Sequence, residues 1–206
     1  MASHPELLNL SPRAARTRAA LIAAGFELLV ERPIDAIAID EVVARAGVAK
    51  GSFFNHFPDK QVFAEAIASE VRVELEELVT RANADVKDPV MRIAGGMRVA
   101  ADFARNNSKR TAVLLRSNAS STARDHPLNQ GLVHDIRAAV DAGLVRPEAE
   151  GSGVLYWLGL CQILMANLVE RRLERADADR RISDMIILGL TGLGVKSSAA
   201  LKLAGR

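Results

Sequence analysis

The chain has 206 residues, of which 49% are apolar and 25% are charged, and its mean hydropathy is close to zero (+0.08). This length and composition predict one or two folded domains with a hydrophobic core and exclude a fully disordered chain. The formal net charge is only +2. Residues 1–60 carry seven basic and seven acidic side chains, so the total charge gives no electrostatic footprint for a nucleic acid.

Cysteine and histidine are too sparse for the common metal sites. Cys161 is the single cysteine, which excludes an internal disulfide and a Cys-based zinc site and fits a cytoplasmic location. No two of the four histidines have the i, i+4 spacing of a helical metal site, so we expect no metal and no cofactor. The first sixteen residues lack the continuous apolar core of a signal peptide.

The periodic segments of the first third all indicate helix. Ser11-Pro12 is typical of a helix start and Arg32-Pro33 of a helix end. Two short helices are predicted next, at 40–46 and at about 50–56, with Gly47 supplying a left-handed turn between them. A long helix is predicted from Lys60, after the break at Pro58-Asp59.

The rest of the chain also has helical periodicity, and we predict an all-α fold. Breaks are expected at Asp88-Pro89, Asn106–Ser108, His126-Pro127 and 143–147. Two long apolar helices follow, at about 148–173 and 178–195, and we expect the segment SSAALKLAGR at the end to be frayed.

One of these helices contains nineteen residues without a charge, GSGVLYWLGLCQILMANLV at 151–169. This length raises the alternative of a membrane-tethered protein. Ser152, Gln162, Asn167 and three glycines argue against a span. We favour a helix that is buried on most sides in a protein–protein interface.

The stretch AGVAKGSFFNHF at 46–57 fits a helix-turn-helix. Phe53 and Phe57 are at i and i+4, so we expect both to pack in a small core. The leading residues of the second helix, 49–52, are small or long and polar, as entry into a major groove requires. Residues 54–56 are left toward the groove and the DNA backbone.

Residues 17–67 resemble the DNA-binding domain of the tetracycline-repressor (TetR) family of transcriptional regulators. The most diagnostic block is AGVAKGSFFNHFPDK at 46–60. The resemblance implies a DNA-binding domain over 1–60 and a ligand-binding and dimerisation domain over 61–206. The residues that it places at DNA are Arg45, Ala49, Lys50, Gly51, Ser52, Phe54, Asn55, His56 and Lys60.

Roles can be carried over for some of these residues. Gly51 would allow close approach to DNA, and Lys50 would contact a base edge or a phosphate. Arg45 would touch the backbone. Lys60 would bind a phosphate together with the N-terminus of its helix. His56 could contact DNA or could cap and pack, and the two alternatives stay open.

Three positions depart from the family pattern, and each departure removes a hydroxyl. Ala49 stands where Ser or Thr is usual, Phe54 where Tyr is usual, and Ala38 where Thr caps the second helix. A lost cap costs about 0.5–2 kcal/mol. Fewer phosphate contacts should weaken DNA binding and flatten its salt dependence.

For the C-terminal domain the sequence predicts a ligand pocket and a dimer interface. Trp157, Cys161 and Met165 lie on one helix face, which is either core, dimer interface or pocket wall. Arg116 is either a surface residue or the partner of an acidic ligand. Expected pocket residues are Phe103, Arg116, Trp157, Cys161 and Met165. Expected dimer residues are Leu155, Leu158, Ile163, Leu188 and Leu193, on helices that could form a four-helix interface with a second copy.

The resemblance implies a cytoplasmic, ligand-responsive regulator, a repressor that binds a palindromic operator in double-stranded DNA as a homodimer. A small apolar or amphipathic effector would release it. We find no catalytic constellation and expect neither an enzyme nor a membrane protein. Two alternatives are left open. One is a helical small-molecule-binding protein or enzyme whose helix-turn-helix serves packing and no longer binds DNA, and the other is a membrane-tethered regulator.

Overall fold

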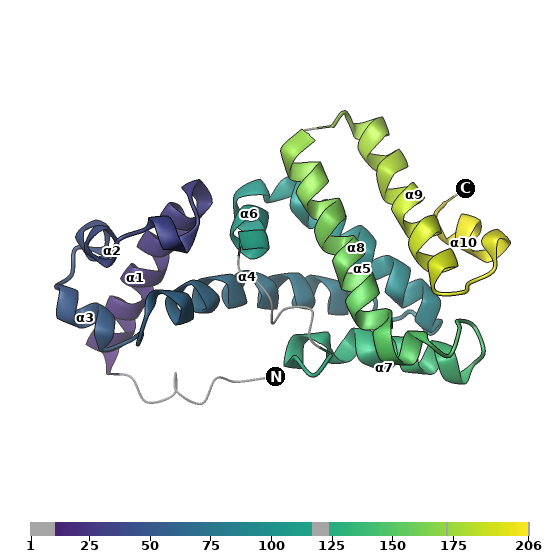
Figure 1. Ribbon diagram of the computed structural model, residues 1–206, viewed down its shortest axis with the longest axis horizontal. Helices are drawn as coiled ribbons and strands as arrows, with labels where there is room; N and C mark the ends of the chain where they lie inside the picture. Colours follow the sequence, from purple (N-terminus) through teal and green to yellow (C-terminus); the bar gives the residue numbers. More distant parts are fainter. Residues whose placement is uncertain (1–10, 117–123, 172, 206) are drawn as a thin grey trace. The chain divides into compact units, whose positions relative to one another are not determined.

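The computed structural model describes residues 11–116, 124–171 and 173–205. Within these residues there is no strand, so the predicted all-α fold is confirmed. Figure 1 shows the helices in chain order. They are α1 (Pro12–Glu31), η2 (Ile34–Ala36), α2 (Ile39–Ala46), α3 (Lys50–Phe54), α4 (Lys60–Ala82), α5 (Pro89–Asn106), α6 (Ser108–Arg116), η4 (Pro127–Asn129), α7 (Gln130–Asp141), α8 (Ala149–Arg171), α9 (Arg175–Gly192) and α10 (Ser197–Leu203).

Local signals set the ends of the first helices. The Ser11 hydroxyl accepts a hydrogen bond from the Ala14 N–H at 3.3 Å, and Pro12 opens α1. The helix stops at Glu31, before Arg32-Pro33. α3 ends at Phe54, two residues earlier than predicted.

The helices form two compact units. The first holds residues 11–71 and 112–116, and the second holds residues 72–111 together with the described residues after Arg116. The predicted boundary at residue 60 coincides with the start of α4, whereas the compact first unit extends to Val71. Both α4 and α6 therefore contribute residues to each unit.

The N-terminal unit is built around three aromatic rings. Phe53, Phe57 and Phe63 are almost fully buried, and their ring centroids lie 4.9–5.7 Å apart. The ring pairs with Phe63 meet edge to face, which suits the quadrupoles of aromatic rings. In a unit this small, these rings anchor α3 and the start of α4 to the apolar face of α1.

The second unit is a helical bundle whose core is shared by α5, α7, α8 and α9. In Figure 1, α8 and α9 run side by side, and α10 lies beside α9. The prediction that the C-terminal segment is frayed is wrong, because residues Ser197–Leu203 form α10. Ala200 and Ala204 are buried in the core, and the Ser183 hydroxyl donates to the Ala204 carbonyl at 3.0 Å.

Candidate functional site

The turn between α2 and α3 has the geometry of a helix-turn-helix. Gly47 has a φ of +67°, in the left-handed region, as predicted. The Val48 N–H donates to the Val43 carbonyl at 3.0 Å and closes the end of α2. Ala38 and Ala49, the residues before α2 and α3, make no side-chain cap, as the missing hydroxyls imply.

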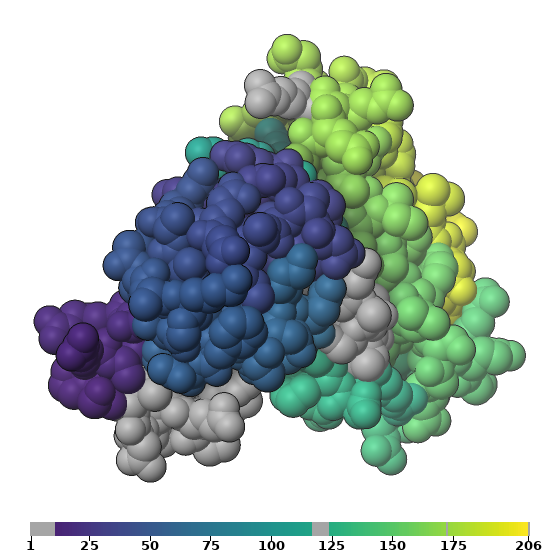
Figure 2. All heavy atoms as spheres, turned by 60° about the vertical axis from the view of Figure 1, so that its left-hand side comes forward, coloured from purple at the N-terminus to yellow at the C-terminus, as the bar shows by residue number. Residues whose placement is uncertain are grey.

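α3 buries one side and leaves the other in solvent. Phe53 is fully buried, whereas Phe54 is 51% exposed. Figure 2 turns the blue surface of the N-terminal unit toward the reader, which includes α2, α3 and the start of α4. Of the predicted DNA-contacting residues, Arg45, Ala49, Lys50, Gly51, Phe54 and Asn55 are exposed, and Ser52 and His56 are half-buried.

Two basic side chains predicted to contact DNA, Lys50 and Arg45, are paired with carboxylates of their own unit. Lys50 Nζ lies 2.8 Å from Asp40 Oδ1, and an Arg45 nitrogen lies 3.6 Å from Glu27 Oε2. Both pairs are exposed, so each contributes little to stability and can open toward a phosphate.

Lys60 has a different environment from the one that the sequence predicts. Its ammonium donates to the carbonyls of Ile34 and Asp35 at 3.3 Å each and to the carbonyl of Ile37 at 3.0 Å. All three donors are engaged, so the predicted contact with a phosphate would require these bonds to break. The residue ties the η2 turn to the start of α4, which the sequence did not indicate.

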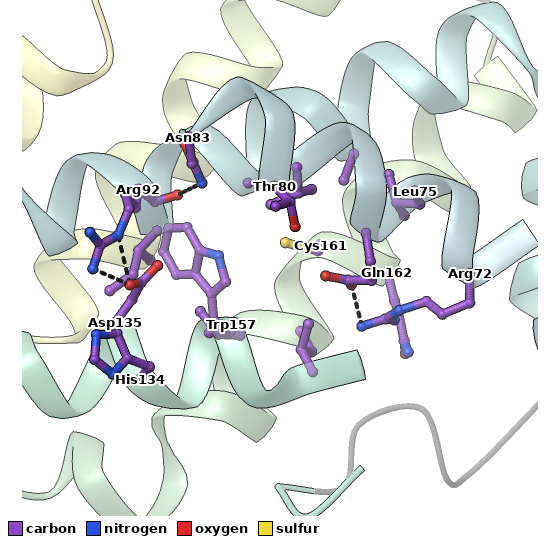
Figure 3. A pocket seen from close by; sticks show the side chains of 18 of the residues that line it. Arg72, Leu75, Thr80, Asn83, Arg92, His134, Asp135, Trp157, Cys161 and Gln162 are labelled. Atoms are coloured by element: carbon purple, nitrogen blue, oxygen red, sulfur yellow. Dashed lines mark hydrogen bonds and ion pairs between the residues drawn. The ribbon is translucent and has the colours of Figure 1, made fainter. Parts of the chain in front are cut away.

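The second unit contains a cavity of about 390 Å³ between α4, α5, α7 and α8. Figure 3 shows it from close by. Its walls are mostly apolar, with a few polar groups, which is the usual composition of a small-molecule site. The apolar side chains that line it include Leu75, Val79, Ile93, Leu132, Trp157, Leu158, Cys161 and Met165.

Two ion pairs lie at opposite ends of this cavity in Figure 3. At one end Arg72 is 8% exposed, and its Nη2 lies 2.6 Å from Asn129 Oδ1 and 2.8 Å from Glu76 Oε1. At the other end, beside Trp157, Arg92 Nε donates to Asp135 Oδ1 at 2.7 Å. The two arginines are thus neutralised within the cavity wall.

Burial shifts two titratable groups of the cavity. It raises the pKa of the Glu76 carboxyl, although the adjacent Arg72 guanidinium acts in the opposite direction. It raises the pKa of the Cys161 thiol to about 12, so the thiol is protonated and unreactive at neutral pH. Among the described residues, no cluster of three or more His, Cys, Asp or Glu could hold a metal ion.

The cavity contains three of the five predicted ligand residues, Trp157, Cys161 and Met165. Phe103 is a core residue outside the lining. Arg116 belongs to the N-terminal unit, where it donates to the carbonyls of Leu29 and Glu31, so it does not line this cavity.

Sequence reasoning missed the charged residues of the lining. A signal existed for one pair, since Arg72 and Glu76 have the i, i+4 spacing of an ion pair. They also share a helix face with the apolar Leu75 and Val79. The Arg92–Asp135 pair joins α5 to α7 and left no local signal.

The predicted dimer residues divide into two groups. Leu155, Ile163 and Leu188 are 61–65% exposed on α8 and α9, which is unusual for large apolar side chains. Leu193 is only 4% exposed and belongs to the core of its own unit. Leu158 is half-buried and lines the cavity, so neither it nor Leu193 offers a free apolar surface.

Among the helices that the structure describes, α8 alone is long and apolar enough to cross a membrane by length and composition. Its buried side chains, among them Trp157, Leu164 and Leu168, pack in the core with α5, α7 and α9. α8 thus packs as a core helix of the bundle, and such helices can be as long and as apolar as a membrane span.

Residues 21–67 match the model of a family described as bacterial regulatory proteins, tetR family. The match covers the helix-turn-helix and the helices on either side of it, less than a quarter of the chain. A relative, the HTH-type transcriptional repressor DhaR of Mycobacterium sp. (strain GP1), is 32% identical over 80 residues. That alignment covers 38% of this chain and 40% of DhaR, so it spans less than half of either protein.

Solved structures extend the likeness in fold to most of this chain. A protein of Shewanella sp. PV-4 assigned to the TetR family has a TM-score of 0.75 at 19% identity, with 86% of this chain and 97% of that one covered. RolR in complex with resorcinol has a TM-score of 0.62 at 20% identity, with 94% and 95% covered. At these identities the likeness shows the fold, a helix-turn-helix unit followed by a helical bundle.

Proposed function

We propose that this protein is a ligand-responsive transcriptional regulator that represses by binding operator DNA. The observation that carries the proposal is the exposed side of α3, which follows a left-handed turn at Gly47 within the segment that matches the family model. DhaR, which is 32% identical to this chain over 80 residues, is named a transcriptional repressor. A regulator of this kind works in the cytoplasm.

The proposed DNA-binding form is a homodimer on a palindromic site. Two recognition helices in successive major grooves of one DNA face are about 34–36 Å apart, a spacing that a dimer can supply. Leu155, Ile163 and Leu188 form an exposed apolar face on α8 and α9 that suits a second copy. Two copies of this helix pair would complete a four-helix interface.

The proposed effector is a small apolar or amphipathic molecule that binds in the cavity of the second unit. RolR, which shares the fold, was solved with resorcinol. α4 contributes Arg72, Leu75 and Glu76 to the cavity wall and begins at Lys60 in the other unit. A shift of α4 on ligand binding could therefore release the DNA. Release requires a coupling of only about 1–3 kcal/mol.

A second candidate is a helical small-molecule-binding protein that no longer binds DNA. It is favoured by the uncapped α2 and α3 and by the pairing of Lys50 and Arg45 with carboxylates. In that case the protein would act only by binding a small molecule in the cavity of the second unit.

The two candidates are separated by selecting bound sequences from random duplex DNA with the purified chain at two salt concentrations. Enrichment of a palindrome with half-sites about one helical turn apart supports the regulator. The Asn55→Ala variant, which alters an exposed side chain after α3, should lose the enrichment while keeping its melting temperature. A folded dimer that enriches no sequence would contradict the regulator and leave the binding protein.

A further inference from the structure

The cavity of the second unit has a balanced set of charges. Its titratable lining residues are Arg72, Glu76, Arg92, His134, Asp135 and Cys161. The formal charges of the two arginines and the two carboxylates cancel, and burial raises the pKa of the Cys161 thiol to about 12, so the thiol is protonated at neutral pH. The wall therefore offers no spare charge to a ligand.

One hydrogen-bond donor in this wall remains unused. Arg72 is 8% exposed, and its Nη2 is engaged by Asn129 and Glu76. Its Nε is buried without a hydrogen-bond partner among the described residues. Figure 3 shows the Arg72 side chain extending from α4 toward the cavity. A buried donor without an acceptor is costly, so an oxygen supplied by a ligand would relieve it.

We propose that the cavity selects an uncharged, oxygen-bearing molecule, such as an ester or a ketone, whose oxygen accepts from Arg72 Nε and whose apolar body reaches Trp157. This inference rests on the proposed function only in taking the cavity as the ligand site. A carboxylate at the same place would add a negative charge beside Glu76. A buried charge without a counter-ion is strongly disfavoured.

Glu76 is consequently the residue that rejects acids. The Glu76 carboxylate forms an ion pair with the Arg72 guanidinium, so that guanidinium is not available as a counter-ion for a carboxylate ligand. In the Glu76→Gln variant the Arg72 guanidinium keeps its hydrogen bond to Asn129 but loses the carboxylate that neutralises it. That variant should accept a carboxylate in the place of the lost one.

The test measures binding without DNA, through the fluorescence of Trp157, which is the single tryptophan of the chain and lines the cavity. The probes are 4-phenylbutanoate and its methyl ester, at about pH 8. An ester enters any apolar site more readily than its acid, so the decisive quantity is the change in the acid-to-ester affinity ratio on mutation. The matched control is Glu77→Gln, which has the same charge change on the same helix at an exposed position outside the cavity lining.

The ester is expected to bind the unaltered chain at least about tenfold more tightly than the acid. Glu76→Gln should shift the ratio at least about tenfold toward the acid, whereas Glu77→Gln should leave it unchanged. Arg72→Lys, which keeps the charge but lacks Nε, should weaken the ester by about fivefold or more, with melting curves showing that the variant is folded.

Equal or tighter binding of the acid by the unaltered chain, binding of neither probe, or an unchanged ratio in Glu76→Gln would each overturn the proposal. Release from the operator is measured separately with the ester. An ester that binds with the expected selectivity yet does not release DNA would count against the proposed regulation and leave the ligand class standing.

Discussion

The Lys50 ammonium at the start of the proposed recognition helix lies 2.8 Å from the Asp40 carboxylate on α2. Both side chains are more than half exposed. The basic residue predicted to reach DNA is therefore already paired with an acid of its own unit. In an operator complex a phosphate would compete with Asp40 for the same ammonium.

Replacing Asp40 with Asn should strengthen DNA binding. The change frees Lys50 and removes one negative charge from the face that would meet the phosphates, so we expect affinity to rise about 3- to 10-fold at low salt. Filter binding or fluorescence anisotropy on a selected operator would measure it. Glu148→Gln makes the same charge change in the other unit and should have a much smaller effect. Equal increases in DNA affinity in both variants would indicate a general effect of net charge and would contradict a specific role of Asp40 in restraining Lys50.

Replacing Lys60 with Met should lower the free energy of unfolding and leave the salt dependence of DNA binding intact. Three carbonyls, those of Ile34, Asp35 and Ile37, lose their donor, which we expect to cost about 1–3 kcal/mol. Urea denaturation measures the loss. A lysine that bound phosphate would instead reduce the salt slope by about one on removal. A stable variant with that reduced slope would restore the phosphate role.

Gly25 should not tolerate a methyl group. A Cβ added there would lie 2.2 Å from Phe63 Cζ and 2.6 Å from Ile67 Cδ1, both in the packed core of the N-terminal unit. Overpacking of this kind costs about 1–3 kcal/mol, so Gly25→Ala should lower the melting temperature.

Gly51→Ala is the matched change for comparison. An added Cβ at Gly51 meets nothing within 4 Å, so the variant should be as stable as the parent or more so. If Gly51 serves close approach to DNA, this variant keeps its stability and loses operator affinity. Equal melting temperatures for Gly25→Ala and the parent would show that α1 and α4 separate easily.

Cys161 should resist thiol reagents in the native protein. Burial raises its pKa to about 12, so at pH 8 the folded chain holds almost no thiolate. Because the folded pKa exceeds that of an unfolded thiol, near 9.0, the protonated thiol favours the folded state below that pH. This contribution is lost as the pH rises toward 12.

Labelling with a disulfide reagent at pH 8 measures this protection. The native chain should react orders of magnitude more slowly than the chain in denaturant, and methyl 4-phenylbutanoate bound in the cavity should slow the reaction further. Rapid native labelling would show that the cavity opens often.

The exposed apolar face of α8 and α9 should be required for dimerisation. Ile163→Glu and Leu188→Glu place charges on side chains that are 65% and 63% exposed in one copy, so neither should unfold the monomer. Analytical ultracentrifugation should show that the dissociation constant of the dimer rises by about tenfold or more. Leu201→Glu, an exposed leucine on α10, is the control. Variants that remain as dimeric as the parent would place the interface elsewhere.

The sequence alone determined the architecture of the N-terminal helices, because their signals are local. Ser11-Pro12 begins α1, Gly47 turns the chain between α2 and α3, and the i, i+4 spacing of Phe53 and Phe57 identifies the core side of α3. Each of these features depends on neighbours within a few residues, so a linear pattern carries it.

The tertiary structure decided which residues make the cavity and which charges are free. Arg72 meets Asn129 across 57 positions, Arg92 meets Asp135 across 43, and Lys60 reaches the Ile34 carbonyl across 26. Likewise Leu193 is in the core, Arg116 is outside the cavity, and the last helix packs where fraying was expected. Such contacts depend on how helices pack at a distance along the chain, and the side chains involved have no periodic signature in the sequence.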